Sequence, residues 1–247
     1  MYGEGRIVGV IEIFKKELQF FIDHEVPQVK FVDRTFNCKH SHSMAIWTYL
    51  KEHDRGKTNF HFEVAADLLN EEEMELIASM RPGLIQLEIG IQSTNPETIT
   101  EIRRKMNFEE VKRIVKRVQE KGNVHQHLDL IAGLPYEDYE RFAQSFRDVY
   151  ALHPEQLQLG FLKVLKGSYM HEKTEDYQLL YQDRPPFEVL STKWLSYDDV
   201  IRLKGVEEMV EVYYNSGQFV NTLRLLEEEF TDTFALYENL SRYYEEN

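Results

Sequence analysis

Five runs of alternating or mostly apolar residues recur along the first two thirds of the chain, and each predicts a β-strand. They occupy residues 29–36, 60–66, 84–92, 127–132 and 157–165. Amphipathic helical patterns separate them, with helix-start signals at Asn70, Asn95 and Asn107 and a glycine stop at Gly122. Strand and helix in alternation predict βαβ units around a parallel sheet.

In three successive strands one face is apolar and the other is largely polar. The polar positions are His61 and Glu63 in one strand, Gln86, Glu88, Gly90 and Gln92 in the next, and His127 and Asp129 in the third. A parallel strand covered by helices on both faces would be apolar throughout. The pattern therefore predicts a complete or partial α/β barrel with a polar interior that holds a polar ligand. The alternative is that these polar residues pair with one another as a buried network.

The helical pattern at residues 12–24 runs directly into the first predicted strand. A crossover helix is normally preceded by a strand, and only the short, glycine-interrupted segment 6–10 is available for that role. Either this segment is a degenerate first strand, or the first βα unit begins upstream of the sequence.

After Gly167 the strand pattern gives way to helical spacing, with a start signal at Ser196 and Asp199. We therefore predict two domains, a partial barrel over residues 1–168 and an α-helical extension over residues 169–247. The extension carries no catalytic motif, and its acidic run at residues 227–229 is typical of a solvated face.

Charge and composition narrow the choice of partners. The net charge of −14 disfavours nucleic acid as the main partner, since the basic residues at 112–121 are interleaved with glutamates. No apolar run approaches the roughly 18 residues of a membrane span, and the start Met1-Tyr2-Gly3-Glu4 lacks a basic signal-peptide opening. We expect a cytoplasmic protein with a small-molecule ligand and no membrane partner.

The single cysteine, Cys38, excludes an internal disulfide and a metal site made of cysteines alone. It begins the sequence Cys38-Lys39-His40-Ser41-His42, whose residue types suit a metal. The spacing differs from that of zinc sites, so we interpret this segment as a helix start.

Three segments in fixed order resemble the signature run of the radical SAM superfamily, whose members use S-adenosylmethionine. They are Leu-Glu-Ile-Gly-Ile-Gln-Ser at residues 87–93, the pair Arg103-Arg104, and Asp-Leu-Ile-Ala-Gly-Leu-Pro at residues 129–135. The resemblance covers roughly residues 29–167 and is strongest to the branch of coproporphyrinogen dehydrogenases, Elongator-type proteins and methylthiotransferases. Phe-Val-Asp-Arg-Thr-Phe-Asn at residues 31–37 also resembles the cobalamin-binding subgroup.

The resemblance implies that S-adenosylmethionine binds to Asp33, Arg34, Thr35, Glu63, Gln92, Arg104, Asp129, Ile131, Gly133 and Phe161. At the methionine end, the loop from Arg34 would follow the amino group, Glu63 would lie nearby, and Arg104 would pair with the carboxylate. The alternatives are that Arg104 is a surface helix residue and that Glu63 pairs with His61 or a lysine.

At the nucleoside end, the resemblance assigns Gln92 and Asp129 to the ribose hydroxyls. It places adenine beside Ile131, in the strand leading to Gly133, and beside the backbone near Phe161. The alternation of polar and apolar residues agrees in part with this assignment. Gln92 and Asp129 lie on the polar strand face, where ligands of parallel α/β folds bind.

One departure from the family pattern is serious. The family binds a [4Fe–4S] cluster through Cys-x-x-x-Cys-x-x-Cys, and this chain has one cysteine. We therefore expect a truncated radical SAM enzyme, inactive alone, whose cluster and any cobalamin belong to a longer parent protein. The alternatives are a cluster-less barrel that binds S-adenosylmethionine, a nucleotide or a partner, and an ordinary lyase or hydrolase using Glu63, Glu88 or Asp129. An open barrel edge would also favour a homo-oligomer.

Overall fold

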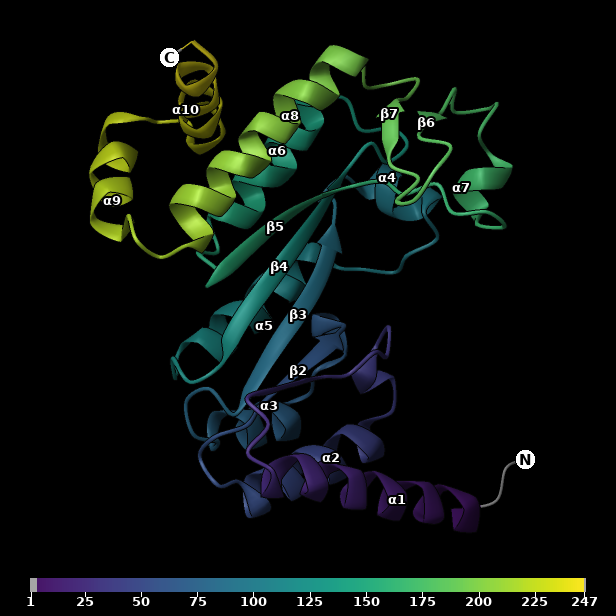
Figure 1. Ribbon diagram of the computed structural model, residues 1–247, viewed down its shortest axis with the longest axis vertical. Helices are drawn as coiled ribbons and strands as arrows, with labels where there is room; N and C mark the ends of the chain where they lie inside the picture. The colour runs from purple at the N-terminus through teal and green to yellow at the C-terminus, as the bar shows by residue number, and fades with distance from the viewer. Residues whose placement is uncertain (1–3, 247) are drawn as a thin grey trace. The chain divides into compact units, whose positions relative to one another are not determined.

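The computed structural model describes residues 4–246. The first three residues, on which the expectation of no signal peptide partly rests, lie outside the described residues. In this part of the chain the main sheet has five strands in chain order, β1-β2-β3-β4-β5 (Figure 1). They are β1 Gln28–Lys30, β2 Asn59–Val64, β3 Ile85–Gln92, β4 His125–Ala132 and β5 Gln156–Phe161. A doubly wound sheet reverses its strand order, whereas a barrel keeps chain order. The predicted partial α/β barrel is therefore confirmed.

Helices precede β1 and connect each strand to the next. They are α1 Glu4–Asp23, α2 His40–His53, α3 Glu71–Ala78, α4 Pro96–Glu101, α5 Phe108–Gln119 and α6 Tyr139–Tyr150. The predicted caps are confirmed, because Asn70, Asn95 and Asn107 each accept a hydrogen bond from the first turn of their helix. Among residues 4–246, no helix combines the length and the apolar character that a bilayer-spanning segment requires.

The first elements exclude one alternative interpretation and correct one predicted strand boundary. Residues 6–10 are not a degenerate strand but part of α1, since extending a helix adds a hydrogen bond per residue and needs no partner strand. The first strand ends at Lys30 rather than at residue 36. Phe31 and Phe36 both pack on Phe62, each with ring centroids 4.4 Å apart, and the residues between them are exposed or half-buried without strand structure. Val32, for example, is 91% exposed.

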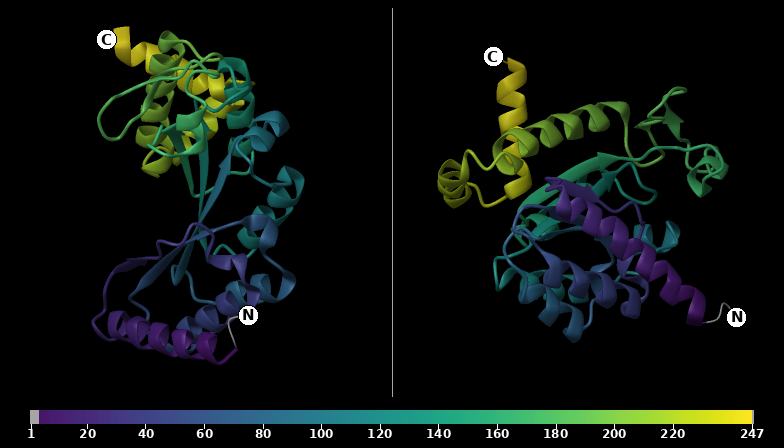
Figure 2. Two further views of the ribbon diagram at one scale, coloured as in Figure 1. Left: turned by 90° about the vertical axis from the view of Figure 1, so that its right-hand side faces the viewer. Right: turned by 60° about the horizontal axis from the view of Figure 1, so that its bottom comes forward.

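The chain forms two compact units. Unit 1 comprises the chain up to Gly90 and Asn107–His127, and unit 2 comprises Ile91–Met106 and Leu128 onward. In unit 1, α1 lies alongside α2 (Figure 2), and it buries Leu18 and Ile22. The fully buried apolar side chains of α2 are Ile46, Trp47 and Leu50.

The C-terminal part of unit 2 is mostly helical, as predicted, but also contains a small antiparallel pair of strands, β6 Leu180–Tyr181 and β7 Val189–Ser191. The helices are α7 Tyr169–Glu172, α8 Tyr197–Met209, a π-helical turn at Val210–Asn215, α9 Val220–Glu229 and α10 Thr233–Glu246. Ser196 and Asp199 form the predicted capping box of α8.

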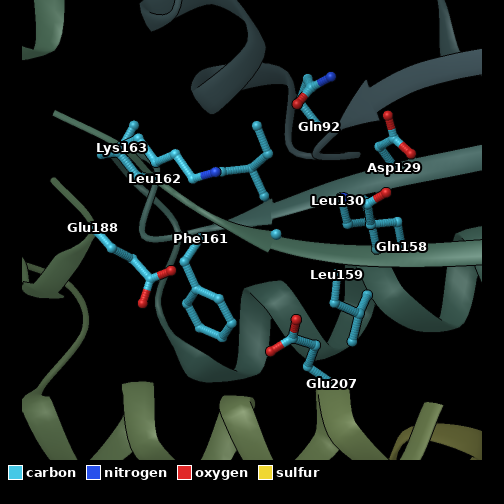
Figure 3. A pocket seen from close by; sticks show the side chains of 12 residues that line it. Gln92, Asp129, Leu130, Gln158, Leu159, Phe161, Leu162, Lys163, Glu188 and Glu207 are labelled. Carbon is cyan, nitrogen blue, oxygen red and sulfur yellow. The ribbon is translucent and has the colours of Figure 1, made fainter. Parts of the chain in front are cut away.

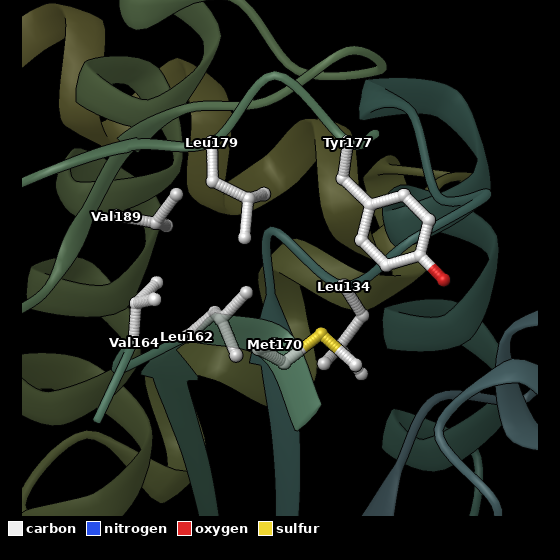
Figure 4. Packing of buried hydrophobic residues seen from close by; sticks show 7 residues of the cluster. All are labelled: Leu134, Leu162, Val164, Met170, Tyr177, Leu179 and Val189. Atoms are coloured by element: carbon white, nitrogen blue, oxygen red, sulfur yellow. The ribbon is translucent and has the colours of Figure 1, made fainter. Parts of the chain in front are cut away.

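A buried apolar cluster joins the end of the barrel strands to this C-terminal part (Figure 4). Its members are Leu134, Leu162, Val164, Met170, Tyr177, Leu179 and Val189. Backbone hydrogen bonds reinforce it, since Val189 N donates to Leu162 O at 2.8 Å and Leu162 N donates to Ala132 O at 2.9 Å. The C-terminal part is therefore packed onto the strand ends of unit 2 and is not a separate appendage there.

Candidate functional site

Unit 2 contains a cavity of about 480 Å³ at the carboxyl ends of the strands. This volume lies within the roughly 300–1,000 Å³ of small-molecule sites. Strand residues form one side of it and C-terminal residues the other (Figure 3). The lining comprises Gln92, Asp129, Leu130, Ile131, Gln158, Leu159, Gly160, Phe161, Leu162, Lys163, Glu188 and Glu207.

Gln92 is the last residue of β3 and lies in the left-handed backbone region, with φ +70°. A non-glycine residue in this region is strained and needs support from its surroundings. Support comes from Ser93, whose Oγ donates to Glu137 Oε1 at 2.6 Å and accepts from Asn95 N at 2.9 Å. The buried Oε1 of Gln92 meets no hydrogen-bond donor among the described residues. A buried polar atom of this kind in a cavity wall suits a ligand that donates hydrogen bonds.

Asp129 is half-buried in β4 and lines the same side of the cavity as Gln92 (Figure 3). A carboxylate and an amide oxygen side by side can accept hydrogen bonds from two adjacent hydroxyl groups. Ile131 and Phe161 add apolar surface to the same lining. The cavity therefore offers acceptors for a diol together with an apolar wall.

The C-terminal part contributes acidic groups to the opposite side of the cavity. Lys204 donates a hydrogen bond to Glu188, and its Nζ lies 4.1 Å from the centroid of the Phe161 ring. Burial raises the pKa of Glu207, an effect that Lys204 opposes and Glu188 reinforces. Sequence reasoning missed both glutamates, because nothing in the local pattern around them indicates a cavity. The alternation of Gln156, Gln158 and Gly160 along β5 did provide a signal for Gln158.

Gly133 lies just beyond β4 with φ +87°, a backbone conformation that favours glycine. A Cβ added here would lie 2.7 Å from Val189 Cγ1. Because Gly133 has no side chain, Val189 of the C-terminal part can pack closely against its backbone.

The structure brings Gln92, Asp129, Ile131 and Phe161 together in one lining. Arg104 belongs to the same unit but is exposed in the turn after α4, and it is not a lining residue. The alternative interpretation made Arg104 a surface helix residue. Arg104 does lie at the surface, but it lies outside the helices.

The remaining predicted site residues belong to unit 1. Asp33 and Arg34 are exposed and Thr35 is half-buried in the irregular segment after β1. Glu63 Oε1 lies 3.9 Å from Lys30 Nζ, so Glu63 does face a lysine, as the alternative interpretation held.

Unit 1 contains a second polar group of residues, formed by the same strand face. Glu88 Oε2 lies 2.7 Å from Lys30 Nζ and 2.8 Å from His61 Nε2. Burial alone would raise the pKa of Glu88, but the hydrogen bond and charge of Lys30 outweigh it and leave the pKa lowered. Burial lowers the pKa of His61 and that of His127. In this unit Glu88 therefore pairs with His61 and Lys30, which agrees with the alternative of a paired polar network for part of the strand face.

The Cys38 segment starts a helix, as interpreted from the sequence. Cys38 is exposed in a 3₁₀ turn, and α2 begins at His40. His40 contacts Glu72 Oε2 at 3.1 Å and Asn70 Nδ2 at 2.8 Å. The ring of His42 packs against the ring of Phe36, with the two centroids 5.4 Å apart.

Two family models match the chain. The model of the radical SAM superfamily matches residues 3–149, and that of a protein family of unknown function, DUF4080, matches residues 175–247. Among curated proteins, the oxygen-independent coproporphyrinogen III oxidase of Paracoccus denitrificans is 32% identical over 100 residues. This match covers 40% of the chain and 22% of the relative, and the Escherichia coli oxidase is 28% identical over 41% of the chain and 23% of its own length. The chain thus matches less than a quarter of either oxidase.

Solved structures share the fold at low sequence identity. Coproporphyrinogen III oxidase (HemN) from Escherichia coli, a radical SAM enzyme, aligns with a TM-score of 0.56 and 18% identity over 84% of this chain and 46% of its own. The radical S-adenosylmethionine methyltransferase TsrM from Kitasatospora setae, solved with cobalamin and a [4Fe–4S] cluster, aligns with a TM-score of 0.57 and 15% identity. That alignment covers 73% of this chain and 37% of TsrM.

Proposed function

Because this chain belongs to the radical SAM superfamily, we propose that its unit 2 binds the nucleoside part of S-adenosylmethionine in the 480 Å³ cavity. The observation that carries the proposal is the buried, unpartnered Oε1 of Gln92 beside the carboxylate of Asp129. These oxygens accept hydrogen bonds from the two ribose hydroxyls, and Ile131 and Phe161 provide apolar surface for the adenine.

The charge of the cavity favours this ligand over a nucleotide. Asp129, Glu188 and Glu207 line it, Lys163 is the cation of the lining, and Lys204 offsets Glu188; the chain carries a net charge of −14. S-Adenosylmethionine carries a positive sulfonium, whereas the phosphates of ATP are repelled by carboxylates. The acidic lining therefore supports a cationic nucleoside ligand.

The [4Fe–4S] cluster of the family does not fit the residues of this chain. Such a cluster needs thiolate ligands, and Cys38, exposed on its 3₁₀ turn, is the single cysteine of the sequence. We propose that reductive cleavage of S-adenosylmethionine depends on cysteines outside these 247 residues, and we assign no chemical step to this chain. The use of cobalamin and the roles of Asp33, Arg34, Thr35, Glu63, Arg104 and Gly133 stay predictions from the resemblance.

Calorimetric titration of the chain with S-adenosylmethionine tests the nucleoside site. We expect binding that Asp129→Ala weakens by up to about 100-fold, since the ligand loses a hydrogen bond to a charged group. The matched control is Glu88→Gln, a carboxylate of the same strand face in unit 1, which should change the affinity less than about twofold.

A second comparison of ligands tests whether the two ribose hydroxyls contribute to binding. Adenosine should bind more tightly than 2′,3′-dideoxyadenosine, and Gln92→Leu should reduce that preference. Unchanged binding in Asp129→Ala, or tighter binding of ATP than of S-adenosylmethionine, would contradict the assignment.

Anaerobic reconstitution with iron and sulfide tests the fit of the cluster. We expect no stoichiometric uptake, because one cysteine cannot supply the thiolates. A stable brown protein with about four irons per chain would contradict this expectation.

A further inference from the structure

Three neighbouring strands of unit 1 each direct one metal-binding side chain to the same place. They are His61 of β2, Glu88 of β3 and His127 of β4. His61 is opposite Gln86 in the β2–β3 register, and Glu88 is two residues further along, so the first two are diagonal neighbours on one face. Long side chains at diagonal positions reach each other. The sheet itself therefore fixes the meeting of these three groups.

The donor atoms are already close enough for a shared ion. One ligand atom from each residue lies within 4.8 Å of the others, and His61 Nε2 is 2.8 Å from Glu88 Oε2. A tetrahedral zinc ion with bonds of about 2.0 Å needs donors roughly 3.3 Å apart. Small side-chain rotations close that difference without moving the strands.

The chemistry of the set is that of a zinc site with an open position. Two imidazoles and one carboxylate are a ligand set of zinc enzymes, which leave the fourth position to water or a substrate. His61 and His127 are 7% and 6% exposed, and burial favours their neutral, ligating form. The Glu88 side chain is 17% exposed, which leaves an entry path for the ion.

Lys30 occupies the position that an ion would take beside the carboxylate. Its Nζ lies 2.7 Å from Glu88 Oε2 and 3.9 Å from Glu63 Oε1, and its side chain is 47% exposed. A flexible, exposed lysine can move fully onto Glu63 when a divalent cation displaces it. Lys30 is therefore a competitor for Glu88, not a barrier to the site.

We propose that His61, Glu88 and His127 bind one zinc ion in unit 1, with the fourth coordination position open. The site uses no residue of the nucleoside cavity, so it stands or falls independently of the proposed function.

The experiment uses the untagged full chain, stripped with a chelator and dialysed against zinc chloride. Metal analysis should give about one zinc per chain, and cobalt(II) in its place should give the visible absorption of a four-coordinate ion. Glu88→Gln and His127→Gln should each weaken zinc binding by about 100-fold or more, beyond the range of outer-shell changes. Zinc should raise the unfolding temperature of the wild-type chain but not of these variants.

Two control variants keep the result decisive. Lys30→Met removes the competing cation and should tighten zinc binding about tenfold, a gain that misfolding cannot produce. Cys38→Ser/His40→Gln removes the exposed alternative ligands and should leave the stoichiometry at one. The proposal is overturned if the wild-type chain binds no zinc, if Glu88→Gln binds it normally, or if the Cys38→Ser/His40→Gln variant loses it.

Discussion

The same polar strand face has two different outcomes in the two units. In unit 1, the carboxylate of Glu88 lies within ion-pair distance of both Lys30 and His61. In unit 2, Gln92 and Asp129 line a cavity, and the buried Oε1 of Gln92 meets no donor among the described residues. Both regions arise from polar and apolar residues that alternate along consecutive strands.

The difference teaches that a polar face does not reveal by itself whether it pairs internally or awaits a ligand. Pairing depends on which charges the fold brings together, as it brings Lys30 Nζ within 2.7 Å of Glu88 Oε2. An open cavity depends on what covers the strand ends, and there Glu188 and Glu207 form the opposite side. Stability measurements on matched variants can separate the two cases.

The largest expected effect concerns two glycines, one in each unit. Gly133→Ala should lower the free energy of unfolding by about 3 kcal/mol, because φ is +87° and the new Cβ would lie 2.7 Å from Val189 Cγ1. Gly122 in unit 1 also has a positive φ, of +60°, but a Cβ added there would have no atom within 4 Å. Gly122→Ala should therefore lower the free energy of unfolding by about 1 kcal/mol. Urea unfolding checks both, and equal losses would show that the contact with Val189 is unimportant.

Next in size is a pH effect from Glu137, which supports the turn after Gln92. Burial raises the pKa of Glu137 from 4.5 to about 7, and the charge of Asp138 adds to this rise. The hydrogen bonds from Ser93 and Ser145 and the charge of Arg141 oppose it. The folded state thus holds this proton more tightly than the unfolded chain does. Its contribution to stability is present below pH 4.5 and is lost as the pH rises through about 7, a change of up to about 3 kcal/mol.

Glu137→Gln should flatten this part of the stability profile, measured by urea unfolding between pH 4.5 and 7.5. Glu88 in unit 1 has the opposite sign, because its pKa is lowered and its contribution is lost on acidification. A Glu137→Gln profile as steep as that of the wild-type chain would contradict the assignment.

A smaller effect compares leucine substitutions at two positions of β3. Glu88→Leu should cost about 1–2 kcal/mol, since His61 loses its carboxylate partner and Lys30 loses the nearer of two neighbouring carboxylates. Gln92→Leu removes a buried acceptor that lacks a donor, so stability should stay within about 0.5 kcal/mol or rise. Unfolding of metal-free protein in urea checks the pair. A large loss at Gln92 would mean that the cavity wall is a paired network as well.

The smallest effect concerns the two edges of the sheet. At the β5 edge, Leu157 N donates to Asn215 Oδ1 and Asn215 Nδ2 donates to Leu157 O, each at 2.9 Å, so the C-terminal part covers this edge in part. The strand at the other end of the sheet order is β1. We expect self-association through the β1 edge, which light scattering would detect as a mass above the 29.4 kDa of one chain. A strict monomer at all concentrations would count against it.

The candidate site could be predicted from the sequence where local pattern determines position. Gln92 and Asp129 were expected to lie together because the carboxyl ends of parallel strands meet at one edge, and both line the cavity. Arg104 was expected near a ligand only through the family resemblance, and it lies in an exposed turn outside the lining. Arg104 follows the short helix α4, and the path of the chain after that helix is not specified by the strand pattern.

Sequence alone determined the strand and helix order, the caps at Asn70 and Ser196, and the polar face of the strands. These features depend on residues a few positions apart, whose periodicity and hydrogen bonding are local. Only the tertiary structure decided that Glu207 borders the cavity, that Val189 fills the space beside Gly133, and that Lys30 pairs with Glu88. Each of these contacts joins segments far apart in the chain, and it forms only because packing of the whole core brings those segments together.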